Sequence, residues 1–298
     1  MFSGKAGPGS MLTGYVLFGF AAVLIKLARQ HDWLVSHALI ARFGLGLAGI
    51  VALSLFARAK GFSWGFEPKN WSLLFWRGFF GGAAMVCYFA AIQHLGAGKG
   101  TLLNYTHSVF ANLFAFLFLR HRPPLLYWPC LAAALCGLWL VVNPGFDRFS
   151  WAEALGLFSG MLGGAAILTI KSLRVTDNAV TIFSVLTLGG LAFCLPALYF
   201  EGGDQIWSLS DVRLRPVGWI ALLGMAVLSM AGQLFFTHGY GGTSVALGTV
   251  MSMITPLLAA LMGWWFLGEL LSPGVLAGGA LILAASVATG LIERRKLV

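Results

Sequence analysis

Two long apolar stretches of this chain repeat each other in an ungapped register. Residues Gly248 to Leu267 align with Gly100 to Leu119, and Gly, Thr, Ala, Leu and Phe recur at matching positions. A second block aligns Gly164 to Arg174 with Gly19 to Arg29, and here a lysine and an arginine recur at equivalent places. Because charged residues are rare in apolar stretches, their recurrence carries more weight than shared leucines. The internal repeat predicts a fold built from two copies of one module.

The composition indicates the environment of this repeat. Hydrophobic residues make up 59% of the chain and charged residues 10%, against roughly 25% charged residues in soluble domains. The formal net charge of +9 would suit a nucleic-acid partner in a soluble protein. Here Lys and Arg fall mostly in short loops between apolar runs, where they orient a protein in the bilayer. We therefore expect an integral membrane protein with no nucleic-acid partner.

The apolar runs are long enough to cross a bilayer as helices, which takes about 20 residues each. They are continuously apolar, whereas the strands of a membrane β-barrel would alternate. The sequence predicts an all-α fold with ten transmembrane helices. The predicted spans are Met11–Ala28, Ser36–Ala57, Trp71–His94, Gly98–Leu119, Leu125–Val142, Ala152–Leu173, Val180–Tyr199, Pro216–Phe236, Thr243–Leu267 and Pro273–Ile292.

The ten spans divide into two sets of five. The first repeat covers 11–145 and the second 146–292, with a flexible tail at 1–10 and a basic cytoplasmic tail at 293–298. More Lys and Arg fall on the side of the amino terminus than on the other side, so both termini are expected in the cytoplasm. An odd number of helices per half makes the halves insert in opposite senses. This inverted repeat is the architecture of many alternating-access transporters.

The repeat and one motif resemble a known family. Pro256 is followed by Leu-Leu-Ala-Ala-Leu, and the stretch closes in Phe-Leu-Gly-Glu269. With the ten spans, this is similar to the EamA-type exporters of the drug/metabolite transporter (DMT) superfamily, and the aromatic-rich spans are most similar to amino-acid exporters of the YddG kind. The first repeat departs from the motif, with Ser108 in place of proline and Arg120 and His121 in place of Gly-Glu. The resemblance implies one bundle around a central cavity, in a bacterial inner (plasma) membrane.

Polar side chains within the spans are expected to mark the site, because polar groups in lipid need partners or water. In the fourth span, Asn104, Ser108 and Asn112 share one helical face, with His107 slightly off it. Hydrogen bonding between helices explains such residues as well as substrate binding does. The candidate substrate-binding residues are Tyr88, Asn104, His107, Ser108, Gln233, Ser252 and Thr255.

Four basic side chains inside the spans form a separate group. Lys26 and Lys171 occupy equivalent repeat positions and are predicted to be gating residues that face opposite sides of the membrane. Arg42 and Arg77 would each cost on the order of 3 kcal/mol at a helix centre, so a role is the starting hypothesis. Both lie near predicted helix ends, where a guanidinium can reach the interface. Anchoring or gating is therefore favoured over substrate contact.

The chemistry that the chain lacks narrows its function. No carboxylate falls in the middle of a span, and there is no His-Glu-x-x-His motif, so we expect neither a metal nor a cofactor nor an enzyme. The sequence favours an exporter of small neutral metabolites, most of all amino acids with aromatic or apolar side chains. Two alternatives stay open. A nucleoside or sugar-phosphate carrier would be favoured if Arg42, Arg77 and the lysines met at one cavity, since a phosphorylated substrate requires several buried Lys or Arg. A non-transporting membrane enzyme or scaffold would have a filled interior without a polar cavity.

Overall fold

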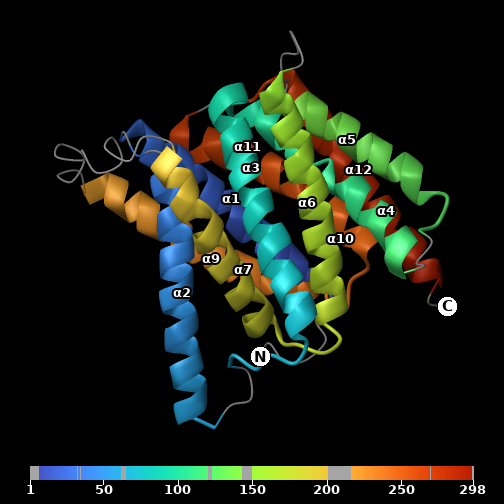
Figure 1. The fold of residues 1–298 in the computed structure, drawn as a ribbon. Helices are drawn as coiled ribbons and strands as arrows, with labels where there is room; N and C mark the ends of the chain where they lie inside the picture. The colour runs from blue at the N-terminus through green and yellow to red at the C-terminus, as the bar shows by residue number, and fades with distance from the viewer. Residues whose placement is uncertain are drawn as a thin grey trace.

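The computed structural model describes residues 7–31, 33, 35–61, 65–119, 123–142, 150–200, 216–268 and 270–296. Within these ranges the ordered elements are helices, and no strand occurs among them (Figure 1). The helices are α1 (Pro8–Gln30), α2 (Val35–Ala59), α3 (Trp71–Asn104), α4 (His107–Leu119), α5 (Tyr127–Val142), α6 (Trp151–Leu173), α7 (Ala179–Phe200), α9 (Pro216–Gly239), α10 (Val245–Ser252), α11 (Ile254–Leu267) and α12 (Pro273–Lys296). The all-α prediction is confirmed.

Most of these helices are long and apolar enough to span a membrane. Over the described part of the chain there are 8 such spans, at Pro8–Ala28, His37–Phe56, Trp71–Ile92, Lys99–Leu119, Trp151–Leu173, Pro216–Gly239, Val245–Leu267 and Pro273–Ile292. Shorter apolar helices at Tyr127–Val142 and Ala179–Leu195 correspond to the fifth and seventh predicted spans. Each predicted span thus has an apolar helix in the structure.

Helical structure extends into both predicted tails. α1 begins at Pro8, within the expected tail 1–10, because proline suits the first position of a helix, where its missing N–H costs no hydrogen bond. α12 continues to Lys296, within the expected tail 293–298, since glutamate, arginine and lysine are good helix formers. Glu269 and the predicted loops at 120–122, 143–149 and 201–215 lie outside the described residues.

α3 contains the whole of one span and the start of the next, and it reverses direction between them. The side-chain oxygens of Tyr88 and Thr101 lie 2.9 Å apart, whereas a straight helix would separate these positions by about 20 Å. A Cβ placed on Gly100 would lie 3.0 Å from the Cα of Ile92. Glycine is therefore needed where the two arms approach, and the third and fourth spans form a helical hairpin.

Equivalent helices of the two repeats make equivalent contacts. α1 packs along α9 as α6 packs along α3, and α1 contacts α11 as α6 contacts α4. A Cβ placed on Gly19 would lie 2.8 Å from the Cβ of Leu258, and one placed on Gly164 would lie 2.7 Å from the Cβ of Phe110. In the register of the repeat, these are equivalent contacts. Small residues permit such close approach between membrane helices, and the fold is two inverted five-helix repeats.

The two ends of the bundle are named here by their landmarks (Figure 1). The termini face is the end where α1 begins at Pro8, and it includes segments 65–70 and 174–178. The hairpin face is the opposite end, with the tip of the α3 hairpin and the start of α6 at Trp151. The equivalent helices α1 and α6 therefore run in opposite directions.

Backbone and side-chain hydrogen bonds close the termini face. The Lys69 backbone N–H donates to the Asp177 carboxylate over 2.7 Å, and the Asn178 amide donates to the Gly65 carbonyl over 2.9 Å. These bonds hold the segment after α2 against the turn between α6 and α7. Because they join the two halves, they must break if this end of the bundle is to open.

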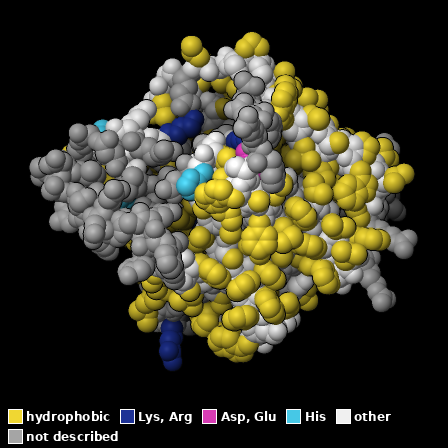
Figure 2. Space-filling model, turned by 45° about the horizontal axis from the view of Figure 1, so that its top comes forward, with side chains coloured by type: hydrophobic (Ala, Val, Ile, Leu, Met, Phe, Trp, Pro, Cys, Tyr) yellow, Lys and Arg dark blue, Asp and Glu magenta, His cyan; other side chains and the backbone are white. Residues whose placement is uncertain are grey.

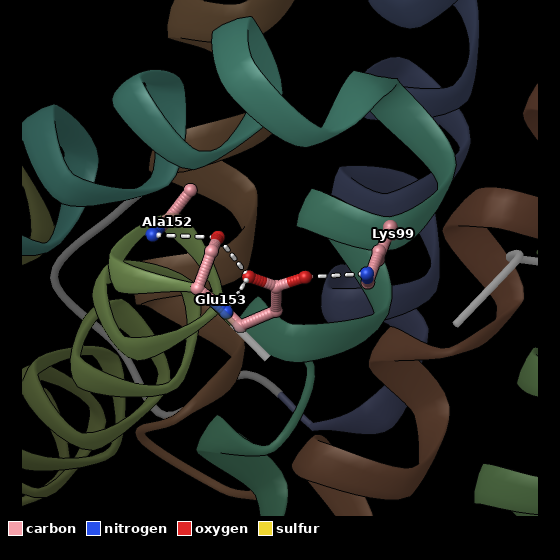
Figure 3. A network of polar contacts seen from close by, with 4 residues as sticks. Lys99, Ala152 and Glu153 are labelled. Atoms are coloured by element: carbon pink, nitrogen blue, oxygen red, sulfur yellow. Dashed lines mark hydrogen bonds and ion pairs between the residues drawn. The ribbon is translucent and has the colours of Figure 1, made fainter. Parts of the chain in front are cut away.

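Among the described residues, an ion pair joins the two halves at the hairpin face, which also has a hollowed surface (Figure 2). Lys99 forms an ion pair with Glu153, which joins the second arm of α3 to the first turn of α6 (Figure 3). Glu153 also accepts from the backbone N–H of Ser150 at 2.7 Å, so it caps its own helix. Figure 2 shows a hollow at this end of the molecule, with Lys or Arg, acidic and His side chains gathered around it.

Candidate functional site

The fourth and ninth spans are both interrupted, and at equivalent positions. α3 ends at Asn104 and α4 begins at His107, while α10 ends at Ser252 and α11 begins at Ile254. Tyr105, in the first interruption, aligns with Met253 in the second. Interrupted helices inside a membrane bundle expose backbone groups where a small molecule can reach them, and they are tolerated only where protein or water satisfies those groups.

Pro256 explains the second interruption. Proline lacks an N–H, so the carbonyl of Ser252, four residues earlier, has no helical donor. The Tyr105 hydroxyl donates to this carbonyl at 3.3 Å. The first repeat thus supplies the group that the second repeat leaves unpaired. Thr255, a predicted site residue, lies half-buried at this crossing.

Three more of the predicted residues meet beside the crossing. The Asn104 amide donates to the Ser159 hydroxyl at 3.0 Å. His107 Nδ1 lies 2.9 Å from the Asn104 carbonyl oxygen, which can only accept, so Nδ1 carries the proton and Nε2 is an acceptor. The Ser252 hydroxyl lies 3.4 Å from Nε2, but its single proton points to the Thr249 carbonyl at 2.7 Å. His107 Nε2 is therefore left as an acceptor at the centre of the bundle.

Ser108, also predicted for the site, lies in a buried network that holds helices together. Its hydroxyl donates to the Thr249 carbonyl at 3.3 Å. One turn further on, the Asn112 amide contacts the Thr249 hydroxyl at 3.0 Å and the Tyr127 hydroxyl at 2.6 Å. Ser108 and Asn112 are 0% and 2% exposed. These satisfied bonds join α4, α5 and α10.

Tyr88 and Gln233 lie on the other side of the centre, around Arg42. The Arg42 guanidinium donates to the Gln233 amide oxygen at 3.4 Å and lies 5.9 Å from the centroid of the Phe18 ring. The Tyr88 hydroxyl lies 2.9 Å from Thr101 Oγ1, one helical turn before Tyr105. Tyr88 therefore connects the Arg42 region to the crossing of the two interrupted spans.

Of the two roles predicted for Arg77, anchoring at the interface is wrong, and gating stays a prediction. Arg77 is 3% exposed, so its side chain is enclosed by protein. A Cβ placed on Gly81 would lie 2.6 Å from Arg77 Nη1, so the side chain runs along its own helix toward the middle of the span. Arg77 lies six residues into α3, and from this position alone snorkelling is expected. The sequence does not show that the side chain points toward the middle of the span.

The predicted gating residues lie toward opposite ends of the bundle. Lys26 is half-buried in the last part of α1, toward the hairpin face, and Lys171 is half-buried in the last turn of α6, toward the termini face. Lys171 Nζ donates to the carbonyls of Tyr240 and Thr243 at 3.1 and 2.8 Å. It therefore ties α6 to the turn between α9 and α10 at the closed end.

Sequence reasoning missed Tyr105 and Thr249, which make central contacts. Tyr105 falls outside the polar face of the fourth span, and Thr249 lies in the ninth span among buried apolar residues. The available signal was Pro256, since a carbonyl without a donor requires a partner from another helix.

No group of three His, Cys, Asp or Glu side chains in the described ranges is arranged to hold a metal. A further groove, lined by Leu113, Phe116, Pro123 and Trp128, is apolar and lies on the outside of the bundle.

Comparison with known proteins identifies relatives along most of the chain. The model of the EamA-like transporter family matches residues 6–143 and again 150–291. The pseudopaline exporter CntI of Pseudomonas aeruginosa strain UCBPP-PA14 is 29% identical over 217 residues, which cover 72% of this chain and 74% of the exporter. The threonine/homoserine exporter RhtA of Salmonella typhimurium strain LT2 is 29% identical over 70% of this chain and 68% of its own.

Two other similarities are more limited. A riboflavin transporter of Rhizobium johnstonii is 31% identical over 184 residues, or 61% of this chain and 58% of that transporter. A solved structure titled "Crystal structure of protein" superposes with a TM-score of 0.73 over 97% of this chain and 99% of that one, at 16% identity. At that identity, the superposition supports the fold alone.

Proposed function

The chain belongs to the EamA-like transporter family, and on this premise we propose that it exports small, largely neutral metabolites by alternating access. We infer that its cargo is an amino acid, most of all one with an aromatic or other apolar side chain. The relatives are transporters and not enzymes, so this chain is a membrane transporter. The exporters CntI and RhtA are named for pseudopaline and for threonine and homoserine, and not for aromatic amino acids. The proposed cargo therefore rests on the side chains at the centre of the bundle.

The observation that carries the proposal is the meeting of Asn104, His107 and Ser252 beside two interrupted helices. These side chains come from both halves, so a bound molecule there would contact each half at once. His107 Nε2 offers an acceptor suited to a substrate ammonium group. A site between the repeats, near the middle of the membrane, is what alternating access requires.

Aromatic rings near the same centre support an apolar side chain on the cargo. Phe18 and Phe236 pack edge to face with centroids 6.3 Å apart, and Tyr105 lies 5.2 Å from the His107 ring. Ligand sites combine apolar walls with a few placed polar groups. Tyr88 and Gln233 would add an aromatic surface and an amide to this site, while Ser108 and Thr255 would hold the crossing helices in place.

We place the protein in a plasma membrane of the bacterial inner-membrane type, with both termini in the cytoplasm. The excess of Lys and Arg on the amino-terminal side supports this orientation. The termini face then lies toward the cytoplasm, and the hollowed hairpin face lies toward the outside. On this assignment the structure corresponds to a conformation open to the outside, with Lys171 holding the cytoplasmic end closed.

Counterflow in proteoliposomes tests the proposal. Vesicles containing the purified chain and an excess of an unlabelled compound are given the same compound in labelled form, over a panel of amino acids and nucleosides. We expect accumulation of labelled phenylalanine or another apolar amino acid, and its loss in His107→Ala. Counterflow of nucleosides alone, or of no compound in the panel, would contradict the proposed cargo.

A further inference from the structure

Arg77 is a buried cation whose hydrogen bonds are not provided by the described residues. It is 3% exposed, and its Nε has no hydrogen-bond partner in this part of the chain. Gly81 lies beside Arg77 Nη1 and beside Leu186 Cδ1, because a Cβ placed on Gly81 would touch both atoms. The side chain next to the guanidinium at this point is therefore apolar. A guanidinium presents five donors and does not lose its charge in proteins. Such a group inside a membrane span calls for a partner.

A second unpartnered group lies in the same region. Tyr240 is 0% exposed, and its hydroxyl is also without a hydrogen-bond partner among the described residues. Tyr240 packs in the same buried cluster as Leu74, which lies one helical turn before Arg77 on α3. A buried Tyr hydroxyl normally finds a partner. Two buried donors left open in one region, one on α3 and one in the turn after α9, indicate one missing acceptor.

The nearby charge strengthens this indication. A second arginine, Arg42, lies in the interior, and within the described part of the chain its hydrogen bond is the 3.4 Å contact with the neutral Gln233 amide. Among the described residues, neither arginine forms an ion pair or a hydrogen bond with an acidic side chain. In the described ranges, Glu153 is paired with Lys99, and Asp177 accepts from Lys69 at the termini face. Two cations in the interior thus lack a neutralising carboxylate from this part of the chain.

We propose that Arg77 and the Tyr240 hydroxyl, with the charge of Arg42 nearby, bind a carboxylate of the transported molecule. The inference deepens the proposed function and rests on it, because the carboxylate is the anionic group of an amino acid. A guanidinium suits this role, since its planar fork matches the two oxygens of a carboxylate. Because the amino group and the carboxylate of an amino acid share one carbon, His107 and Arg77 would both face that carbon in the bound state.

The same donors could receive a phosphate, which shares the anionic oxygens of a carboxylate. The two sources are distinguished by using L-phenylalanine, L-phenylalaninamide and inorganic phosphate as separate probes. The amide keeps the ring and the amino group of phenylalanine but lacks the negative charge. A site built for a carboxylate discriminates between the first two probes, and a phosphate site responds to the third.

The test measures binding by the shift in thermal unfolding of the purified full chain in detergent. For the unmodified chain, we expect L-phenylalanine to bind about tenfold to a hundredfold more tightly than its amide, as charged hydrogen bonds imply. In Arg77→Gln this ratio should fall to about one, and in Tyr240→Phe it should fall partway. Arg58→Gln is the matched control, because Arg58 is exposed at the end of α2, and the ratio should not change.

The melting temperatures of the unliganded proteins separate an effect on folding from an effect on binding. Removing an unpaired buried cation should leave the melting temperature of Arg77→Gln equal to or above that of the unmodified chain. Equal binding of acid and amide by the unmodified chain, or an unchanged ratio in Arg77→Gln, would overturn the inference. The inference would also be overturned, in favour of a phosphorylated cargo, by one further result. That result is a thermal shift with phosphate that is lost in Arg77→Gln, together with no shift with phenylalanine. Failure of the proposed function is distinct, because it is the absence of amino-acid counterflow in proteoliposomes.

Discussion

The hydroxyl of Tyr105 donates a hydrogen bond to the backbone carbonyl of Ser252, 3.3 Å away and in the other half of the molecule. Pro256 leaves that carbonyl without a helical donor. Tyr105 lies in the interruption of the fourth span, and Ser252 ends α10 at the equivalent interruption of the ninth span. The inverted repeat is therefore not symmetric in its chemistry at the centre, since one half lacks a donor and the other half supplies it.

Replacing Tyr105 tests this relationship directly. Tyr105→Phe removes the donor to the Ser252 carbonyl and should lower the free energy of unfolding by about 1 kcal/mol. In Pro256→Ala the backbone N–H of residue 256 can satisfy the same carbonyl, so the loss caused by Tyr105→Phe should be smaller there. Denaturant unfolding of the four proteins of this double-mutant cycle measures the coupling. An equal loss in both backgrounds would mean that the hydroxyl acts through Thr255 or another contact.

The helices could be predicted from sequence because each needs only a local signal. Continuous apolar runs between turn residues specify spanning helices, and the recurrence of lysine and arginine in the aligned segments revealed the repeat. The interruption at Tyr105 carries no such signal, since Ser108 stands where the second repeat has proline. It depends on bonds such as that from Thr106 Oγ1 to the Leu103 carbonyl at 2.6 Å.

The interior charges could not be placed from sequence for a different reason. Whether an arginine near a helix end snorkels to the interface or turns inward depends on the helices packed beside it. Arg77 turns along α3 toward Gly81, against Leu186 of α7. The polar stripe of the fourth span was recognised, but only the structure separates Asn104 and His107, which adjoin the crossing, from Ser108 and Asn112, whose bonds lie within the buried network.

Close glycine contacts predict where the bundle tolerates no side chain. A Cβ on Gly164 would lie 2.7 Å from the backbone nitrogen of Ala111, so Gly164→Ala forces α4 and α6 apart and should cost about 1–3 kcal/mol of stability. Gly44→Ala is the control, because nothing lies within 4 Å of its Cβ and alanine favours helix. Thermal unfolding in detergent should rank Gly164→Ala well below Gly44→Ala. Equal melting temperatures would show that the helices can move apart freely.

The site assignment predicts that binding and stability separate between neighbouring residues. Asn104→Ala and His107→Ala should each weaken binding of the transported amino acid by roughly tenfold to a hundredfold, because a polar group of the ligand loses its partner. Asn112→Ala should instead lower stability and leave affinity nearly unchanged, since Asn112 bonds only within its buried network. Binding and unfolding are measured on the same preparations. Normal affinity in both Asn104→Ala and His107→Ala would place the site elsewhere.

The topology is tested with single cysteines in a chain from which the native cysteines have been removed. Gln30 is exposed where α1 ends near the hairpin face, and Lys60 is exposed just after α2 near the termini face. In intact cells, an impermeant thiol reagent should modify Gln30→Cys but not Lys60→Cys. Permeabilised cells provide the control, since both should then react. Protection of Gln30→Cys together with reaction of Lys60→Cys would reverse the proposed orientation.

Lys171 should control how readily the termini face opens. Lys171→Met keeps the apolar stem but removes the bonds to the Tyr240 and Thr243 carbonyls, so conformations open at that face gain population. We expect a changed counterflow rate with little change in affinity, and faster thiol labelling of a cysteine at the buried position Thr243. Lys26→Met, the equivalent change at the hairpin face, should alter the rate without exposing residue 243. Unchanged rates in both variants would leave the two lysines as charges that orient the protein and nothing more, because a gate that can be removed without effect does not limit opening.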